Sequence, residues 1–210
     1  MKRIIIVDTD SGNILSVCRA LEKIGYNYKI SKDIKDYQNA DRIILPGVGS
    51  FKKLIDKLES INFCTLLDVI KKKQIPLLGI CVGMQVMMTK GFEFGEHKGL
   101  NLIEGEVRLI DKENLSHKLK IPNINWLPNK IKRLNINNEL KNLLLKKFYF
   151  IHSYCCEVKN DEDCLSYYNY GNLNITSCIK NKNFLGVQFH PEKSGITGLN
   201  FLNYFLTKEI

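Results

Sequence analysis

The sequence predicts an α/β fold, with a doubly wound, mostly parallel sheet and an antiparallel C-terminal extension. In the first half of the chain, apolar strand-like runs alternate with amphipathic helical segments, as in parallel α/β sheets. In the second half, strand-like segments follow one another with few helical segments between them. The length of 210 residues, 44% of them hydrophobic, suits one buried core, so we expect residues 1–210 to form a single domain.

The elements of the first half follow from the apolar runs and their breaks. Ile4–Val7 is a continuous apolar run, typical of a strand buried on both faces. Apolar residues then recur at helical spacing from Ile14 to Ile24, and Gly25 is a suitable left-handed stop. The further elements expected are a strand at Asp41–Leu45, a helix capped by Ser50, a helix near Thr65–Lys73, a strand at Pro76–Ile80 and a helix after Cys81.

The second half has a different pattern. Its strand-like segments are separated by turns rich in Asn and Gly, which favours antiparallel pairing. Only Thr197–Leu206 has a clear helical pattern, and the Lys- and Asn-rich stretch Leu127–Lys147 is expected to be a surface excursion. The strands expected here are Gly105–Ile110, Phe148–Ser153, Cys164–Tyr170, Asn174–Ile179 and Phe184–Phe189.

A net charge of +9 is compatible with nucleic-acid binding. The lysines are scattered through nearly every segment, however. The densest run, Lys71–Lys73, closes a predicted helix, where cations complement the helix dipole. Because charge without a nucleic-acid-binding motif is weak support, no nucleic-acid partner is expected.

The chain contains no apolar run close to the ~20 residues of a membrane-spanning helix. Lys2 and Arg3 precede the first apolar run, as in a signal peptide, but that run ends after Val7, at Asp8. We therefore expect a cytoplasmic protein without a membrane partner.

The chain has seven cysteines at irregular spacing, and no two of them form a Cys-x-x-Cys pair. This pattern does not suggest a disulfide framework or a zinc site. We expect no metal and no cofactor, and we expect six of the cysteines to be inert small hydrophobic side chains.

One cysteine has a distinctive setting. Gly79-Ile80-Cys81-Val82-Gly83 follows a predicted buried strand and opens a helix, which is the cysteine form of a nucleophile elbow. Such a sharp turn exposes the nucleophile at the carboxyl edge of the sheet and leaves little room for flanking side chains. The helix start would direct free amides and its positive end at Cys81, favouring the thiolate. A structural cysteine beside packing glycines is the alternative.

A second motif, Phe189-His190-Pro191-Glu192, ends another strand. A carboxylate two residues from a histidine can bind one ring nitrogen and leave the other to accept a thiol proton. Alone, the pair fits a surface histidine beside an unrelated glutamate as well. Cys81 and His190 both end apolar strands, however, and sites in open α/β sheets gather at such ends. We predict Cys81 as nucleophile, His190 as base and Glu192 as the group that orients the histidine.

A third strand end carries Pro46-Gly47-Val48-Gly49. Such a loop can present backbone amides to a developing oxyanion, with the amide of Val82 as partner donor. By itself the loop is only a glycine-rich turn. Together the three strand ends indicate a cysteine hydrolase or acyl-transfer enzyme, without identifying the acyl group.

Five segments resemble the class I glutamine amidotransferases, and within them the glutaminase subunit of imidazole glycerol phosphate synthase. They run nearly from end to end in the family's order: Asp8-Thr9-Asp10-Ser11-Gly12-Asn13, Leu45-Pro46-Gly47-Val48-Gly49-Ser50-Phe51, Gly79-Ile80-Cys81-Val82-Gly83-Met84-Gln85, Ile151-His152-Ser153-Tyr154 and Gly186-Val187-Gln188-Phe189-His190-Pro191-Glu192-Lys193-Ser194. The resemblance implies a flavodoxin-like fold. It also implies that Cys81 attacks the side-chain amide of glutamine, ammonia leaves and water hydrolyses the thioester.

The resemblance further implies the contacts of the substrate. It assigns oxyanion stabilisation to the backbone amides of Val48 and Val82. Glu93 would suit the α-ammonium group of glutamine, because a carboxylate can pair with it. The positions that match the family's glutamine site are Gly49, Gln85, Glu93, Ser153 and Tyr154.

Chain length suggests a partner. Ammonia released into neutral water is mostly protonated and lost as a nucleophile, yet 210 residues leave no room for a second catalytic domain. The resemblance implies a heterodimer with a (β/α)₈-barrel synthase subunit that makes imidazole glycerol phosphate and AICAR in histidine biosynthesis. We expect the interface on the strand-end face that carries Asn13, Pro46–Gly49 and Trp126.

One segment departs from that subfamily. The chain has Pro122-Asn123-Ile124-Asn125-Trp126 where the histidine-pathway subunit typically has Pro-His-Met-Gly-Trp. Asn123 and Asn125 leave open a paralogue that feeds another synthase, such as one that amidinates a surface sugar. A cysteine peptidase of the same fold is a further alternative, but it would not need Gln85 and Glu93 to capture a free amino acid. A non-catalytic regulatory module is disfavoured, because all three triad positions are filled.

Overall fold

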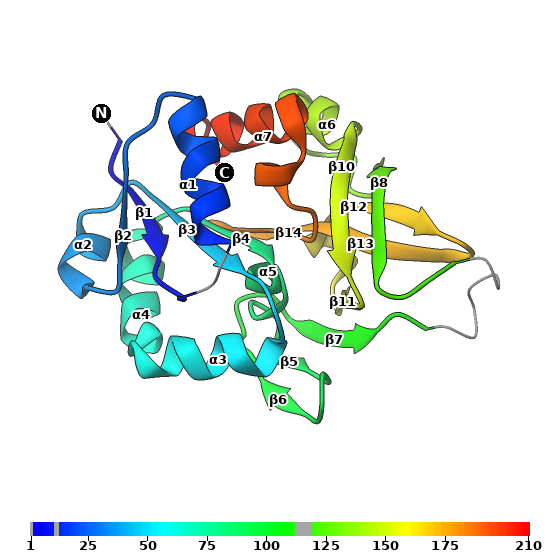
Figure 1. Cartoon of the computed structure of the whole chain (residues 1–210), viewed down its shortest axis with the longest axis horizontal. Helices are drawn as coiled ribbons and strands as arrows, with labels where there is room; N and C mark the ends of the chain where they lie inside the picture. Colours follow the sequence, from blue (N-terminus) through cyan, green and yellow to red (C-terminus); the bar gives the residue numbers. More distant parts are fainter. Residues whose placement is uncertain (1, 11–12, 112–118) are drawn as a thin grey trace.

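The structure is a computed structural model that describes residues 2–10, 13–111 and 119–210. Its central eight-stranded sheet has the order β2-β1-β3-β4-β14-β13-β12-β9 (Figure 1). Neighbouring strands are parallel from β2 to β14 and antiparallel from β14 to β9. The predicted mostly parallel α/β fold with an antiparallel extension is confirmed. The strands of this sheet are β1 (Ile4–Val7), β2 (Tyr28–Ser31), β3 (Arg42–Gly47), β4 (Leu77–Cys81), β9 (Lys130–Ile131), β12 (Cys164–Tyr170), β13 (Leu173–Asn181) and β14 (Phe184–Val187).

Helices cover both faces of the parallel half, which is why its inner strands β1, β4 and β14 are almost entirely apolar, whereas the edge strand β2 is not. Helices α1 and α7 lie on one face, and α3 and α4 lie on the other (Figure 1). Every residue of β1, β4 and β14 is buried. The described helices are α1 (Ile14–Lys23), α2 (Ile34–Gln38), α3 (Phe51–Ser60), α4 (Phe63–Lys73), α5 (Val82–Gln85), α6 (Asn138–Leu144) and α7 (Gly195–Thr207), with short 3₁₀ turns at Asp161–Asp163 and Pro191–Lys193.

Two smaller sheets flank the carboxyl edge of the parallel strands. One is the antiparallel pair β8 (Asn123–Pro128) and β10 (Lys147–His152). The other has the order β11-β7-β5-β6 and contains β11 (Tyr154–Val158), β7 (Gly105–Leu109), β5 (Lys90–Gly91) and β6 (His97–Lys98). Only Ser153 separates β10 from β11, so the chain passes from one small sheet to the other at this residue.

The stretch 127–147 is more ordered than predicted, because it contains the end of β8, then β9 and α6. The surface-excursion prediction is therefore wrong in part. Leu140 and Leu144 of α6 are buried, and Asn137 caps the helix by accepting hydrogen bonds from the amides of Glu139 and Leu140. Lys141 and Asn142 lie between these two buried leucines.

Two helix ends were predicted from single residues, Gly25 and Ser50, and only the first prediction is confirmed. Gly25 ends α1 as predicted, with a φ of 79° and an amide that bonds the carbonyl of Glu22. Ser50 precedes α3, but its side chain forms no capping hydrogen bond. The carboxylate of Glu93 accepts instead from the amide of Phe51 at 2.6 Å. Ser50 as side-chain cap is therefore wrong, since a distant carboxylate satisfies this helix end.

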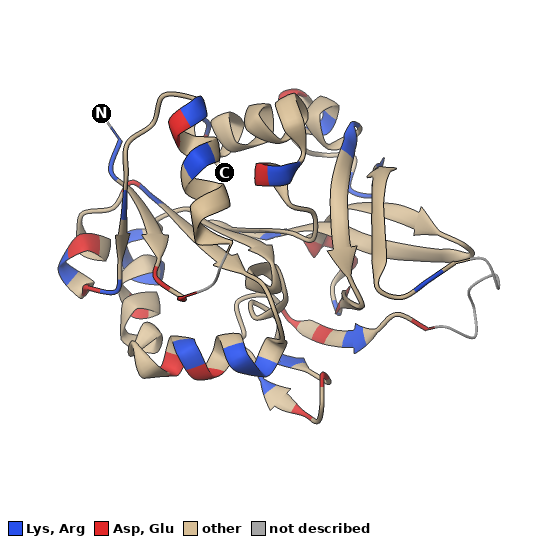
Figure 2. Cartoon of the chain, viewed as in Figure 1, with Lys and Arg blue, Asp and Glu red and all other residues tan. Residues whose placement is uncertain are grey.

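Lysine and arginine side chains are spread over many elements and alternate with acidic ones, most plainly along α3 (Figure 2). Within α3, Lys52 and Asp56 form an ion pair one helical turn apart. Among the described helices, none is long and apolar enough to cross a bilayer.

Candidate active site

Cys81 ends β4 in a strained turn, with φ 55° and ψ −111°. The flanking glycines are required by close backbone contacts. A Cβ atom at Gly83 would lie 2.0 Å from the carbonyl oxygen of Leu45, and one at Gly79 would lie 2.6 Å from that of Gly83. The predicted crowding of the elbow is confirmed. The turn leaves Cys81 at the carboxyl end of its strand.

The helix after Cys81 is shorter than predicted. α5 spans only Val82–Gln85, because the carbonyls of Val86, Met87 and Met88 bond amides of the 100–103 segment instead of continuing the helix. A single turn carries little of the dipole of a full helix. The predicted helix start at Cys81 is present, but because it is a single turn we expect activation of the thiol to depend also on a neighbouring base.

His190 is the predicted base. Its side chain is 1% exposed, and its Nδ1 lies 2.7 Å from Oε1 of Glu192, whose side chain is fully buried. A carboxylate accepts only, so Nδ1 carries a proton, and in the neutral ring Nε2 has a free lone pair. Nε2 is buried without a hydrogen-bond partner in the part of the chain that the structure describes.

The charge balance at His190 favours the imidazolium. Burial opposes its charge, but the negative charge available to Cys81 and the hydrogen bond with Glu192 outweigh this effect and raise the pKa of His190. Cys81 therefore lies close enough to act on the imidazole. A histidine that holds its proton strongly is suited to stabilise a thiolate beside it.

Asn13 has a role that the sequence analysis did not assign. It stands at the N-terminus of α1, is 4% exposed, and donates through Nδ2 to Oε1 of Glu192 at 2.5 Å. The placement of Asn13 on an exposed partner face is therefore wrong. Its buried amide holds the carboxylate that in turn holds His190.

A cavity of about 310 Å³ opens beside Cys81. It brings together every predicted substrate residue, whereas Glu192 stands behind His190. Four lining residues were not predicted, namely Pro122, Ile151, His152 and Lys193. The predicted residues that line the cavity are Val48, Gly49, Cys81, Val82, Gln85, Glu93, Ser153, Tyr154 and His190.

Gln188 is a further residue that the sequence analysis missed. It is fully buried just before His190, and its Nε2 donates to Sγ of Cys81 at 3.6 Å. Its Oε1 accepts from Nε2 of Gln85 at 3.1 Å, and the same Gln85 nitrogen donates to the carbonyl of Tyr154 at 3.0 Å. The sequence did contain a signal for this role, because Gln188 is a polar residue within the otherwise apolar run Gly186-Val187-Gln188-Phe189.

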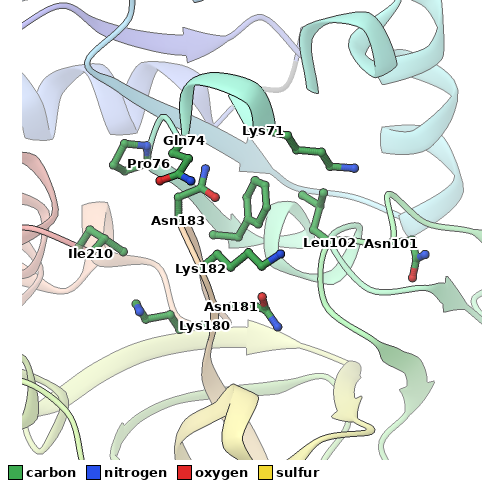
Figure 3. Close-up of a pocket in the computed structure, with 11 residues that line it drawn as sticks. Lys71, Gln74, Pro76, Asn101, Leu102, Lys180, Asn181, Lys182, Asn183 and Ile210 are labelled. Carbon is green, nitrogen blue, oxygen red and sulfur yellow. The ribbon is translucent and has the colours of Figure 1, made fainter. Parts of the chain in front are cut away.

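A larger cavity of about 900 Å³ lies at the opposite, amino ends of β4 and β14 (Figure 3). Its described lining contains no cysteine, histidine or acidic side chain that could serve as nucleophile or base. The lining residues are Lys71, Gln74, Pro76, Asn101, Leu102, Lys180, Asn181, Lys182, Asn183, Phe184 and Ile210. The chemistry-bearing groups therefore gather in the smaller cavity, at the carboxyl edge.

The sequence profile of the family "Glutamine amidotransferase class-I" matches residues 5–208. This chain belongs to that family. Its members hydrolyse glutamine, so the amidotransferase has the chemistry that a cysteine, histidine and carboxylate in one cavity can support. The peptidase alternative is set aside by this membership.

Individual relatives match over nearly the full length. The amidotransferase is 37% identical to imidazole glycerol phosphate synthase subunit HisH of Lactococcus lactis, over 98% of both chains. It is 38% identical to the subunit of the same name from Pelagibacter ubique, over 96% of this chain and 97% of that one.

Solved structures share the fold at low sequence identity. A PurLQS structure from Thermotoga maritima aligns with a TM-score of 0.69 at 17% identity, covering 98% of each chain. The glutaminase domain of Trypanosoma brucei CTPS aligns with a TM-score of 0.65 at 17% identity, covering 100% of this chain and 96% of that one. These likenesses support the fold alone.

Proposed function

We propose that this chain is the glutaminase subunit of an imidazole glycerol phosphate synthase in histidine biosynthesis. The observation that carries the proposal is that Cys81 and His190 line one cavity with Glu192 bonded to His190 behind it, in a chain 35% to 38% identical to subunits of that name from several bacteria. Its substrate is glutamine, and its products are glutamate and ammonia.

The proposed reaction begins with proton transfer from Sγ of Cys81 to Nε2 of His190, while Glu192 holds the Nδ1 proton. The thiolate attacks the amide carbon of glutamine. His190 returns the proton to the amide nitrogen, which leaves as ammonia and forms a thioester on Cys81. His190 then deprotonates a water molecule that hydrolyses the thioester and releases glutamate.

Backbone amides of Val48 and Val82 are proposed to stabilise the oxyanion formed in both halves of this reaction. Val82 is the first residue of α5, where amide groups have no partner within the helix. Val48 lies between two glycines, and a Cβ atom added at Gly49, which has a φ of 94°, would have nothing within 4 Å. We propose that the loop after Gly47 can change conformation and so reorient the Val48 amide, because glycine is conformationally permissive.

The rest of the cavity suits a free amino acid. One carboxylate oxygen of Glu93 accepts from the amide of Phe51 at 2.6 Å, which fixes the side chain at the cavity wall. We propose that its other oxygen pairs with the α-ammonium group of glutamine. Gln85, Ser153 and Tyr154 line the same space and are proposed to hold the remainder of the substrate.

The outer face of the β8–β10 pair is the proposed docking surface for a (β/α)₈-barrel synthase subunit. Ile124 and Trp126 of β8 are 53% and 52% exposed, and Ile151, opposite Ile124 in register, is 36% exposed. Ile151 also lines the glutamine cavity. Exposed apolar side chains gathered beside an active site are typical of a partner interface, which favours a heterodimer.

The two asparagines that suggested another partner have different positions. Asn123 is fully buried and donates to the hydroxyl of Tyr168 at 3.0 Å, so its side chain is not available to a partner. Asn125 is exposed on β8 and donates to Oδ1 of Asn123 at 2.7 Å. Since both amides already have partners within the chain, they give little support to a paralogue that feeds another synthase, and we favour the histidine pathway.

A titration tests this proposal. Purified barrel subunit from a histidine pathway is added to the chain while glutamate formation is measured. We expect activation at micromolar partner and complete loss of activity in Cys81→Ala, because a thiolate nucleophile has no substitute here. The control is Cys64→Ala, which replaces an exposed cysteine on α4. Glutamine hydrolysis in Cys81→Ala would overturn the catalytic assignment, and absence of activation in the wild type would overturn only the histidine pathway.

We further infer that residues 1–210 form one domain in the cytoplasm. One cluster of buried apolar residues supports this inference, because it joins β1 near the start of the chain to β13 and to α7 near its end. One cooperative unfolding transition, coincident by two spectroscopic probes, is the expected result. Two separate transitions would contradict the single domain.

A further inference from the structure

A continuous series of buried polar groups links exposed β8 to the glutamine cavity. Asn125 donates to Asn123 at 2.7 Å, and Asn123 donates to the hydroxyl of Tyr168 at 3.0 Å. The same hydroxyl lies 2.8 Å from Nε2 of His152, and Nδ1 of His152 lies 2.8 Å from the carbonyl oxygen of Tyr154. Three of the elements involved, β8, β10 and β12, belong to two different sheets.

Donor and acceptor roles in this series have only one consistent assignment. The carbonyl of Tyr154 can only accept, so Nδ1 of His152 carries its proton. Burial lowers the pKa of His152 to about 4, so the ring is neutral and Nε2 is an acceptor. The Tyr168 hydroxyl must then donate to Nε2, which leaves its oxygen to accept from Asn123.

We propose that Asn125, Asn123, Tyr168 and His152 form a directional hydrogen-bond relay that positions the Tyr154 carbonyl, and through it Gln85 and Gln188, around the nucleophile. The proposal deepens the glutaminase function and rests on it. None of the four residues in the relay exchanges a proton with substrate. They are positioning residues.

The far end of the relay reaches the reacting atom. The Tyr154 carbonyl that accepts from His152 also accepts from Nε2 of Gln85 at 3.0 Å. Gln85 donates in turn to Gln188, and Gln188 donates to Sγ of Cys81 at 3.6 Å. Every link beyond Asn125 is largely buried, so water cannot readily replace a lost partner. A relay missing one group leaves its neighbours unsatisfied and free to move.

Chemistry also explains why asparagine suits position 123. Its amide accepts from one side, from Asn125, and donates on the other, to Tyr168. A side chain with only one of these capacities would interrupt the direction of the series. Asn123, one of the two residues that depart from the subfamily pattern, is thus the link that joins β8 to Tyr168.

The test compares two buried tyrosines of β12. Tyr168→Phe removes the relay hydroxyl and keeps the ring. Tyr170→Phe is the matched control, because Tyr170 is also buried and its hydroxyl donates to the carbonyl of Lys120, outside the relay. With saturating barrel subunit present, we expect Tyr168→Phe to lower kcat/KM for glutamine about tenfold, mainly through KM, and Tyr170→Phe to change it less than about twofold.

A second measurement does not depend on glutaminase activity. ¹⁵N NMR of the histidine rings should show His152 in the wild type and in Tyr170→Phe as a neutral Nδ1–H tautomer with a hydrogen-bonded Nε2. In Tyr168→Phe the Nε2 resonance should shift toward that of an unbonded acceptor. If Tyr168→Phe does not fold, Asn123→Asp keeps the shape of the side chain but makes it an acceptor only. It should draw the Tyr168 hydroxyl away from His152 and produce the same shift.

The outcomes separate the two proposals. If Tyr168→Phe matches Tyr170→Phe in both kcat/KM and the His152 resonances, the relay is overturned. If the wild type does not hydrolyse glutamine but the His152 resonances shift as described, the proposed function fails while the relay geometry stands. A resonance shift without any change in kcat/KM would overturn the positioning role.

Discussion

At the scale of single residues, the chemistry depends on how Glu192 and Asn13 hold His190. One oxygen of Glu192 bonds both Nδ1 of His190 and the amide of Asn13. The other oxygen is buried and has no hydrogen-bond partner among the described residues. A carboxylate in this position fixes the tautomer of the imidazole. It also raises the pKa of His190, because a negative charge beside the ring stabilises the imidazolium.

Glu192→Gln tests that role, because it preserves the shape of the side chain and removes its charge. The pKa of His190 should fall and the imidazolium formed during the reaction should lose its stabilisation. We expect kcat to fall roughly 10²-fold or more, but less than in His190→Ala. Steady-state glutaminase kinetics with the partner present measure this loss. Glu157→Gln, on an exposed position of β11, is the control. Wild-type kcat in Glu192→Gln would reduce the triad to a Cys81–His190 dyad.

At the scale of elements, the site depends on how closely β3, β4 and α5 approach one another. Gly47, Gly79 and Gly83 occupy positions where a Cβ atom would contact backbone atoms at 2.0 to 2.6 Å. Backbone of this kind cannot move aside as the end of a side chain can. The elbow is therefore a packing feature of three elements as well as the turn that places the buried Cys81 at the cavity.

Gly83→Ala should destabilise the fold by about 3 kcal/mol or prevent folding, because its Cβ would overlap the carbonyl of Leu45. Gly25→Ala is the comparison. Gly25 has a positive φ of 79° but nothing within 4 Å of its Cβ position, so only conformational strain of about 1 kcal/mol is expected. Urea denaturation measures both free energies of unfolding. Equal losses would show that the close approach at the elbow is relaxed in solution.

At the scale of the whole molecule, the cavity, the loop that carries Val48 and the apolar face of β8–β10 are neighbours. Val48 and Ile151 line the cavity and are partly exposed, at 37% and 36%. A partner seated on this face would contact the loop that carries one oxyanion donor. Docking can therefore shift the population of that peptide toward the productive orientation.

We expect the isolated chain to hydrolyse glutamine slowly and to accelerate when the barrel subunit binds. Trp126→Ala should raise the partner concentration needed for half-maximal activation about tenfold or more, because a central exposed tryptophan is a frequent hot spot. Leu134→Ala, which removes a side chain that is 74% exposed and lies outside β8 and β10, should leave that concentration unchanged. An isolated chain as fast as the complex would contradict gating by the partner.

The sequence alone determined the parallel strands β1, β3 and β4, the elbow at Cys81 and the pairing of His190 with Glu192, whereas it missed the parallel strand β2. These features are local: an apolar run, glycines on both sides of a cysteine, and a carboxylate two residues from a histidine each have a physical meaning within a few residues. The glutamine-site positions came from family resemblance, and the cavity brings all of them together.

The tertiary structure alone decided which polar groups meet across the chain. Asn13 reaches Glu192 over 179 positions, Gln188 reaches Cys81 over 107, and Asn123 reaches Tyr168 over 45. The tertiary structure also showed that α5 is a single turn. At the start of α3, the amide of Phe51 bonds the carboxylate of Glu93 and not the side chain of Ser50. Hydrogen bonds are directional and short, so their partners depend on the packing of whole elements, which hydrophobic periodicity does not specify.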